Sequence, residues 1–462
     1  SSYLAAQDLK NFDISIKLSL EGIGAVLRWE DGYTVVNSIV PGGAAARNGK
    51  LKPDDRIIAV AQGDKAFESV IDMRLNNVVQ LIRGKRGTKV GLQVLRKTKK
   101  GFDTLKIVIM RDKIVLKDGE AQSSIFEQPA AVESKSKQEM LRIGVIKLRS
   151  FYVDFNDRRK NPGNYKSSSR DVKVLLKKFV DENVDGVILD LRNNGGGGLD
   201  EAINMAGLFI GHNPVVIVRQ SGGRRVTVHR SRERAVYTGP LVIMLNRYSA
   251  SASEILAGAM HDYQRAFLVG DTTTFGKGTV QNIFQLPEGY GALKVTIAQF
   301  YRVSGWSTQN RGVETSFVLP SLNNAREIGE STLDNALPWR SIDPVSYRVS
   351  GNLKKVLPQL KKLSAERIAN SDFFQKIDED VQEYLTKIKP LKYTSILKMQ
   401  EDDTRRKTQR DQELAFATKK ETEEKSATEE SPESKKEIQR DDYMNESMAI
   451  LADYINLQQK TE

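Results

Sequence analysis

The chain has 462 residues, 39% hydrophobic and 28% charged, which predicts about three domains of roughly 150 residues with cores of their own. No apolar run approaches the roughly 20 residues of a spanning helix, so we expect no stable membrane insertion. There is no cysteine, and three histidines are too few for a clustered metal site, which excludes disulfides, thiolate metal sites and cysteine nucleophiles. We therefore expect no metal and no cofactor.

The first residues show neither a basic end nor an apolar stretch, so no signal peptide is predicted. Either a leader has been removed or the chain is a fragment of a longer protein.

The net charge of +12 is compatible with nucleic-acid binding, so its distribution matters. Basic residues form short scattered clusters at 96–100, 158–160 and 224–225. No aromatic residues interleave these clusters for base stacking, so we expect no nucleic-acid partner. The first cluster is interpreted as a solvated hairpin tip, and attraction to an anionic surface stays open.

Residues 14–116 contain short β-like runs separated by turn signals, which predicts a compact, β-rich module. One amphipathic helix is expected over residues 72–83. Residues 1–13 are expected to be the end of a helical segment, and residues 117–140, rich in Ser, Glu, Lys and Ala, a linker. The strands of the module are expected at 24–27, 33–36, 56–60, 90–95 and 105–109.

Residues 141–325 alternate strand and helix patterns, which predicts an α/β core. Near-continuous apolar strands at 184–191 and 241–245 are typical of a sheet buried on both faces. Residues 326–462 are predicted to be a helical, charged domain. Residues 401–442 contain 10 Lys or Arg and 14 Asp or Glu, which indicates a solvated helix or partial disorder.

Ser251 lies at a predicted strand-to-helix turn, where backbone N–H groups and the helix dipole favour a developing oxyanion. A helix N-cap is the alternative. The helix after Ser251 and the strand after it are each about 16 Å long, so the loop at 271–278 should return to the level of Ser251. Lys277, between two glycines in that loop, is a candidate base if its pKa is depressed, and a solvated turn is the alternative.

A histidine base is disfavoured, because His261 lies about 15 Å along the same helix and neither His212 nor His229 lies in a glycine-rich or acidic context. No Gly-x-Ser-x-Gly motif surrounds these serines, so a conventional hydrolase elbow is not supported. The glycine-rich loop at 190–198 joins a buried strand to a helix and can expose backbone N–H groups to an anion. Its glycine spacing matches neither Gly-x-Gly-x-x-Gly nor the Walker loop. Phosphate binding and an oxyanion hole both stay open as interpretations.

Three segments then carry a resemblance: residues 190–197 (DLRNNGGG), 249–255 (SASASEI) and 275–281 (FGKGTVQ). They resemble the three signatures of the tail-specific (C-terminal processing) proteases, serine peptidases with a Ser–Lys dyad on a core related to crotonase and Clp protease. The module containing residues 19–26 (SLEGIGAV) resembles that family's PDZ domain. Residues 334–339 (DNALPW) and the helical tail resemble the C-terminal region of the large Gram-negative members.

The resemblance assigns roles to individual residues. It implies Ser251 as the nucleophile, Lys277 as the base and Gln281 as the residue that orients the lysine. It implies oxyanion donors at Gly196, Gly197 and Ala252. It implies supporting positions at Arg192, Glu254, Asp262 and Thr274. It implies that a substrate carboxylate binds at Gly22, Ile23, Gly24 and Ala25. The loop at 271–275 is one residue longer than the common family form.

The implied fold is a multidomain α/β chain with a PDZ module, a crotonase/Clp-protease-like core and a C-terminal helical region. The implied activity is that of an ATP-independent, periplasmic serine endopeptidase for proteins with apolar C-termini. Whether an adaptor protein docks on the C-terminal helices stays open. Two alternatives stay open: a catalytically inactive PDZ-containing scaffold and a crotonase-type acyl-CoA enzyme.

Overall fold

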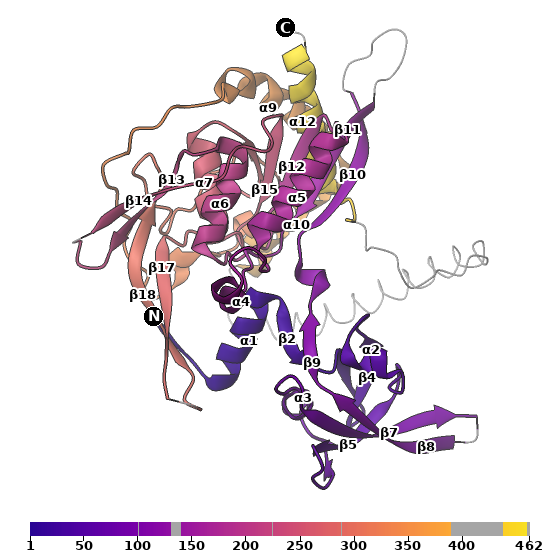
Figure 1. Ribbon diagram of the computed structural model, residues 1–462. Helices are drawn as coiled ribbons and strands as arrows, with labels where there is room; N and C mark the ends of the chain where they lie inside the picture. The colour runs from indigo at the N-terminus through magenta and orange to yellow at the C-terminus, as the bar shows by residue number, and fades with distance from the viewer. Residues whose placement is uncertain (100, 131–139, 224, 288, 390–437, 460–462) are drawn as a thin grey trace. The chain divides into compact units, whose positions relative to one another are not determined.

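The computed structural model describes residues 1–99, 101–130, 140–223, 225–287, 289–389 and 438–459 (Figure 1). These residues form two compact units. The N-terminal unit comprises Ala5–Glu120 and Asp154–Tyr165, and the core unit comprises Ser1–Leu4, Ala121–Val153 and the described part of Lys166–Glu462. The expected boundary near residue 325 therefore does not separate compact units.

The N-terminal unit is built on an antiparallel sheet with the strand order β3-β4-β5-β7-β8, and β6 pairs with β5. A shorter pair joins β2 and β9. Because β3 pairs on one side with β4 and stands at the end of the order, no described strand pairs with its other edge, which is the kind of edge to which another strand can add. The strands are β2 (Ser19–Gly22), β3 (Ala25–Glu30), β4 (Tyr33–Ile39), β5 (Arg56–Gln62), β6 (Glu68–Ser69), β7 (Lys89–Thr98), β8 (Gly101–Met110) and β9 (Asp112–Val115).

Helices α2 (Ala44–Asn48) and α3 (Leu75–Ile82) pack on this sheet. A helix is present where one was expected over 72–83, but it begins only at Leu75, because Asp72 has a left-handed φ of 59°. Val78 and Ile82 of α3 enter a core with apolar residues from every long strand. Helix α1 (Ala6–Lys17) passes the expected boundary at residue 13, so the module begins as helix and not as strand. The helix ends where Leu18 adopts a left-handed conformation with a φ of 48°.

The main sheet of the core unit has the strand order β10-β11-β12-β15-β16-β19. All neighbours from β11 onward are parallel, and β10 is antiparallel to β11. The strands are β10 (Gln122–Pro129), β11 (Met140–Lys147), β12 (Gly186–Asp190), β15 (Leu241–Leu245), β16 (Phe267–Gly270) and β19 (Phe317–Val318).

The expectation of a linker over 117–140 is wrong for its described part. Lys117–Gly119 form a 3₁₀ turn, and β10 pairs along its whole length with β11. The strand was missed because it is an edge strand with a polar sequence, whose only large apolar residues are Ile125 and Phe126.

A second, antiparallel sheet follows the order β1-β18-β13-β14, with β17 also paired to β18. Its strands are β1 (Ser2–Leu4), β13 (Pro214–Gln220), β14 (Val226–Arg230), β17 (Thr279–Gln285) and β18 (Ala292–Tyr301). Because β17 starts two residues after Lys277, this sheet fixes the position of the lysine loop.

Helices cover both faces of the main sheet (Figure 1). Helices α5 (Ser168–Asp181), α6 (Leu199–Ile210) and α7 (Ala252–Asp262) lie on the near face in the figure, and α12 (Asp442–Gln459) packs on β12 and β15 from the other face. The remaining helices are α4 (Phe155–Lys160), α8 (Leu322–Ala325), α9 (Leu353–Ala369) and α10 (Asp372–Glu383), with short turns at Glu330–Thr332 and Tyr384–Ile388.

The described part of the C-terminal region completes the main core. Met444, Met448 and Leu451 of α12 are fully buried with Ile188 and Val242 of the sheet. The expected helical character is confirmed, but α12 belongs to the same compact unit as the sheet. The charged stretch over 401–442 lies mostly outside the described residues.

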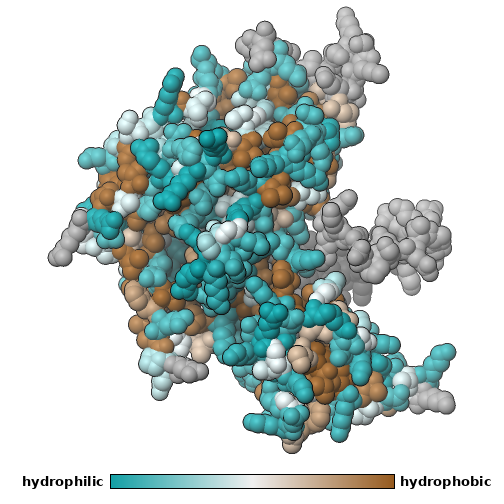
Figure 2. Space-filling model, viewed as in Figure 1, coloured by the Kyte–Doolittle hydropathy of each residue, from teal (hydrophilic) through white to brown (hydrophobic). Residues whose placement is uncertain are grey.

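Polar side chains surround small groups of apolar ones on the face shown in Figure 2. In the basic cluster at 96–100, Arg96 forms an ion pair with the buried carboxylate of Asp55 at 2.7 Å, so this residue is more than a solvated hairpin tip. Among the described helices, none combines the length and hydrophobicity that a membrane crossing requires. The described residues contain no cluster of metal-ligating side chains.

Candidate active site

Three loops meet at one edge of the main sheet. Strands β12, β15 and β16 are parallel, so the loops that follow them leave from the same edge. These loops carry the glycine-rich segment, Ser251 and Lys277. The Phe275 N–H donates a hydrogen bond of 3.0 Å to the Ser249 carbonyl, which joins the lysine loop to the serine turn.

Ser251 occupies the N-cap position of α7 in an unusual backbone conformation. Its φ is 56° and its ψ is −109°, a combination that L-residues seldom adopt. The side chain is half-buried, so a substrate can reach it. A sharp strand-to-helix turn of this kind presents the hydroxyl at the start of a helix and strains the backbone.

The strain predicts a stability difference between two inactive variants. The free energy of unfolding of Ser251→Gly should exceed that of Ser251→Ala by about 1 kcal/mol, because relief of a positive φ exceeds the entropic cost of glycine. Ser251→Gly should therefore unfold at a higher temperature. Thermal unfolding of the two proteins measures this difference. Equal stability, or a more stable alanine variant, would contradict the strained turn.

Lys277 lies in an environment that favours its neutral form. Burial lowers its pKa from the usual value, and the positive charge of Lys294 lowers it further, against opposing effects of Glu330 and Glu254. Its Nζ donates a hydrogen bond of 3.0 Å to Oε1 of Gln281 on β17. Among the described residues, no hydrogen bond joins the Lys277 amine to the Ser251 hydroxyl.

The fully buried Glu254 connects the two loops. Its Oε2 accepts hydrogen bonds from the N–H of Ser251 at 2.7 Å and of Lys277 at 3.0 Å. Its Oε1 accepts from the Thr274 hydroxyl at 2.6 Å and the Gly276 N–H at 2.7 Å. Burial raises the pKa of Glu254 to about 7, against the lowering effect of these four donors. One carboxyl group therefore sets the spacing between the serine and lysine backbones.

The glycine-rich loop approaches the serine turn at Gly196. A Cβ atom at this position would lie 2.8 Å from the Ser251 Cβ, and the φ of 106° is one that only glycine adopts readily. At Gly197 a Cβ would clash with the carbonyl oxygen of Phe151. Both glycines are thus required by close approach.

The N–H groups of this loop differ in their availability. The Gly196 N–H donates to Oδ1 of Asn194 at 2.9 Å, so it is engaged within the loop. The N–H groups of Gly197 and Ala252 have no acceptor among the described residues. The loop is also bonded to the serine turn, because the Asn194 carbonyl accepts from Ala250 N–H at 3.0 Å and from the Ser253 hydroxyl at 2.8 Å.

Two of the expected supporting residues do not contact the serine or the lysine. Asp262 lies at the opposite end of α7 from Ser251, about 15 Å along the helix, and pairs with Arg302. Arg192 turns toward Asp190 and Asp441. Thr274 does take part, through its hydrogen bond to Glu254.

In the N-terminal unit, the segment from Gly22 to Ala25 links β2 to the edge strand β3. The carbonyls of Ile23 and Gly24 accept hydrogen bonds from Ala45 and Val40, at 2.7 and 2.9 Å. The N–H groups of Ile23 and Gly24 have no acceptor in the described part of the chain. Helix α3 packs beside β3, the strand into which this segment leads.

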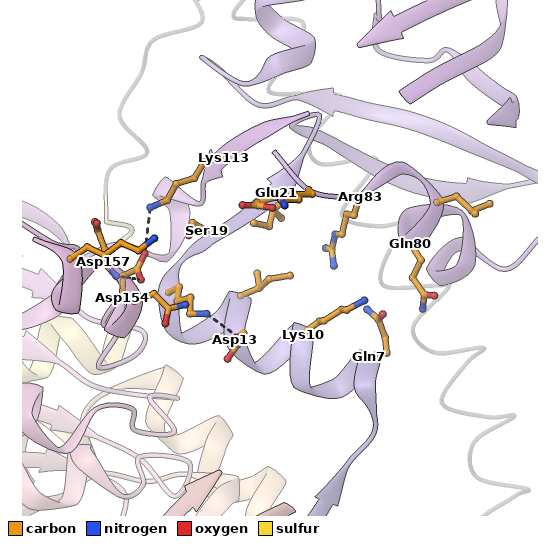
Figure 3. A pocket seen from close by; sticks show the side chains of 18 residues that line it. Gln7, Lys10, Asp13, Ser19, Glu21, Gln80, Arg83, Lys113, Asp154 and Asp157 are labelled. Carbon is orange, nitrogen blue, oxygen red and sulfur yellow. Dashed lines mark hydrogen bonds and ion pairs between the residues drawn. The ribbon is translucent and has the colours of Figure 1, made fainter. Parts of the chain in front are cut away.

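A cavity of about 880 Å³ lies beside this segment in the N-terminal unit (Figure 3). It is lined by ion pairs between Lys17 and Asp13 and between Lys113 and Asp154. Figure 3 shows Arg83 pointing toward α1 across the cavity. Burial lowers the pKa of Arg83. The cavity is charged and contains none of the residues expected to carry the chemistry.

Comparison with known proteins adds independent information. The model of peptidase family S41 matches residues 142–319, that of the PDZ domain residues 13–95, and that of the C-terminal domain of tail specific protease residues 323–456. The tail-specific protease of Haemophilus influenzae is 40% identical over 393 residues, which cover 83% of this chain and 53% of that protein. The chain thus spans about half the length of this relative.

Two further proteins are similar to this chain. The carboxy-terminal processing protease CtpA of Bacillus subtilis is 31% identical over 401 residues, covering 86% of this chain and 75% of that protein. The solved PDZ domain of a carboxy-terminal protease from Vibrio cholerae, in complex with a peptide, is 48% identical; the match covers 21% of this chain and 98% of that domain, with a TM-score of 0.20. The length and identity of the match to the Bacillus protein, together with the three matched regions, show that the chain belongs to peptidase family S41, the C-terminal processing serine proteases.

Proposed function

We propose that this chain is an ATP-independent serine endopeptidase that selects protein substrates by their C-terminal tails. The observation that carries the proposal is the buried Glu254 carboxyl, which holds the backbone N–H groups of both Ser251 and Lys277. A structural helix cap needs the first of these bonds and not the second. The fold of the core would be related to those of crotonase and Clp protease, as the resemblance implies.

The reaction would begin with the neutral Lys277 amine. A neutral amine has a free lone pair while one N–H donates to Gln281, so it can take the proton of the Ser251 hydroxyl as the oxygen attacks the substrate carbonyl. The amine would then give this proton to the leaving nitrogen as the C–N bond breaks. Water, activated by the same lysine, would hydrolyse the acyl-enzyme and restore Ser251.

The developing oxyanion would be stabilised by backbone donors. The N–H groups of Gly197 and Ala252 are suited to this because neither has an acceptor among the described residues, whereas the Gly196 N–H donates to Asn194. The part of Gly196 would be to let the loop approach Ser251 closely. Lys277 must still reach the Ser251 hydroxyl, so substrate binding would complete the dyad.

Selection of the tail would use the open edge of β3. An extended peptide can add to this edge and place its terminal carboxylate against the N–H groups of Ile23 and Gly24. Its last side chain would then lie near α3, which favours apolar C-termini. A periplasmic location, implied by the family resemblance, belongs to this proposal as well.

Digestion of an unfolded protein, with and without an apolar C-terminal tail, tests the proposal. The tailed protein should be cleaved and the untailed one spared, and the Ser251→Ala variant should cleave neither. Binding of the tail without cleavage by the unmodified protein would instead support the inactive scaffold.

The free carboxylate makes a separate prediction. Amidation of the tail should slow cleavage of a long substrate about tenfold or more, the equivalent of about 1.4 kcal/mol, because the backbone donors lose an anionic partner. Hydrolysis of a short internal peptide with blocked ends provides the control and should not change on addition of amidated tail. Equal rates for the free and amidated tails would contradict recognition of the terminus.

A further inference from the structure

The glycine-rich loop begins with an ion-pair arrangement that reaches beyond the site. Arg192 donates from Nε and Nη2 to the two carboxylate oxygens of Asp190, at 3.0 and 2.8 Å. Asp190 is the buried last residue of β12, and the Arg192 side chain is 16% exposed. A guanidinium this far removed from water needs its remaining donors satisfied, because burial of an unpaired charge is costly.

The remaining partner comes from the other end of the chain. Arg192 Nη1 donates to Oδ2 of Asp441 at 2.9 Å, across 249 residues of sequence. Asp441 directly precedes α12, and its Oδ1 accepts the Met444 N–H at 2.8 Å. One carboxylate therefore caps the helix and holds the arginine at the same time.

The position of Asp441 is fixed by the packing of α12. Met444 and Leu451 of this helix are fully buried against the sheet, and a Cβ atom at Gly186 would lie 2.8 Å from Leu451 Cδ2. The helix is thus docked closely on β12, the strand that leads into the loop. Its first turn cannot shift without disturbing this packing.

Hydrogen bonds of the two loop residues after Arg192 connect the fixed arginine to the glycines at 195–198. Asn193 has a φ of 61°, and it exchanges hydrogen bonds with Asn246: its N–H donates to Oδ1 at 2.9 Å and its Oδ1 accepts from Nδ2 at 2.8 Å. Asn194 then holds the Gly196 N–H and the serine turn. A continuous set of bonds connects Asp441 to the segment beside Ser251.

We propose that Asp441 is a positioning residue for the oxyanion-binding loop, which makes the geometry at Gly197 depend on the docked start of α12. The inference rests on the proposed function. It assigns to the C-terminal helix a part in catalysis that touches neither substrate nor dyad.

Two variants separate this role from helix capping. Asp441→Ser keeps a preferred capping side chain but is too short and uncharged to pair with Arg192. Asp441→Asn keeps an acceptor oxygen and loses the charge. The matched control is Glu446→Gln, one turn further along α12, because Glu446 bonds to Ser364 and Arg367 of α9 and contributes nothing to Arg192.

The test measures kcat and KM for a short peptide and the affinity of a peptide aldehyde, whose adduct with the serine places an oxyanion in the site. Asp441→Ser and Asp441→Asn should lower kcat and aldehyde affinity about tenfold or more, with KM within about twofold, because misplacement of the donors affects the transition state selectively. Glu446→Gln should lower the unfolding temperature and leave kcat near the unmodified value. Unchanged kcat in both Asp441 variants, or an equal loss in Glu446→Gln, would overturn the inference.

Amide hydrogen exchange keeps the inference testable without hydrolysis. Residues 191–197 should exchange about tenfold or more faster in Asp441→Ser than in the unmodified protein and in Glu446→Gln, since the loop would open locally at lower cost. If the unmodified protein hydrolysed nothing and this difference were still seen, the proposed function would fail and the positioning role of Asp441 would stand. Identical exchange in all three proteins would refute that role.

Discussion

Replacement of either Ser251 or Lys277 by alanine should lower kcat by about 10⁴-fold or more, and the double variant should be no slower than the worse single one. Nucleophile and base act as a unit, so removal of one already abolishes the catalysis to which both contribute, and removal of the other causes no further loss of rate. Both variants should remain folded, since the substitutions retain the Cβ atom. Hydrolysis of a tailed protein, followed at enzyme concentrations high enough to detect the residual rate, checks this. A double variant much slower than both singles would show that the residues act independently.

The pH dependence of the same reaction follows from the lysine. The base must be neutral, so the rate should rise with pH through the depressed pKa of Lys277. Lys294→Gln is the matched variant: loss of its positive charge should raise the pKa of Lys277 and move the profile to higher pH, with little change in the maximal rate. A profile that is flat between about pH 6 and 9 would exclude Lys277 as the base.

Glu254→Gln should lower kcat by about 10²- to 10³-fold, although the residue touches no substrate. An amide offers one acceptor oxygen and turns an NH₂ group toward two of the four donors that now meet the carboxyl. The backbones of Ser251 and Lys277 would then move apart. Thr274→Val, which removes one of the four donors and keeps the shape, is the control and should cause a much smaller loss. Similar rates for Glu254→Gln and the unmodified protein would show that this carboxyl does not set the spacing.

The pKa of Glu254 also predicts opposite effects of pH on stability and on activity. Its pKa is raised from 4.5 to about 7 in the folded protein, so its contribution to stability is greatest below pH 4.5 and is lost as the pH rises through about 7. Activity should rise as the pH rises through about 7, because a protonated Glu254 directs a hydrogen atom toward groups that are themselves hydrogen-bond donors. Unfolding and hydrolysis measured across this range in unmodified protein and Glu254→Gln would separate the two effects.

The parts of the site that the sequence predicts are those with local signals. A serine at a strand-to-helix turn, a lysine between glycines and a glycine-rich loop after an apolar strand each lie within a few residues of their defining pattern. The lengths of the predicted helix and strand place the loop at 271–278 at the level of Ser251. In the structure the Phe275 N–H donates a hydrogen bond to the Ser249 carbonyl at this level. The strand at 241–245 was predicted with its exact bounds because it is uniformly apolar.

The parts that the sequence did not predict depend on distant partners. Asp441 and Arg192 are 249 residues apart, and nothing near either residue indicates the other. Strand β10 is polar because it forms a sheet edge, and the strands of the second sheet, β13, β14, β17 and β18, were not expected as a group. For Glu254 the motif indicated a supporting position, but its four donors come from two loops that only the fold brings together.

Trapping the covalent intermediate tests directly whether Ser251 is the nucleophile. The protein would be mixed with a tailed, unfolded substrate, quenched in acid during turnover, and digested for peptide mass spectrometry. An acyl adduct is expected on Ser251, formed by the unmodified protein and absent from Lys277→Ala and Ser251→Ala. An adduct on another residue, or cleavage of the tailed substrate that persists in Ser251→Ala, would contradict this expectation.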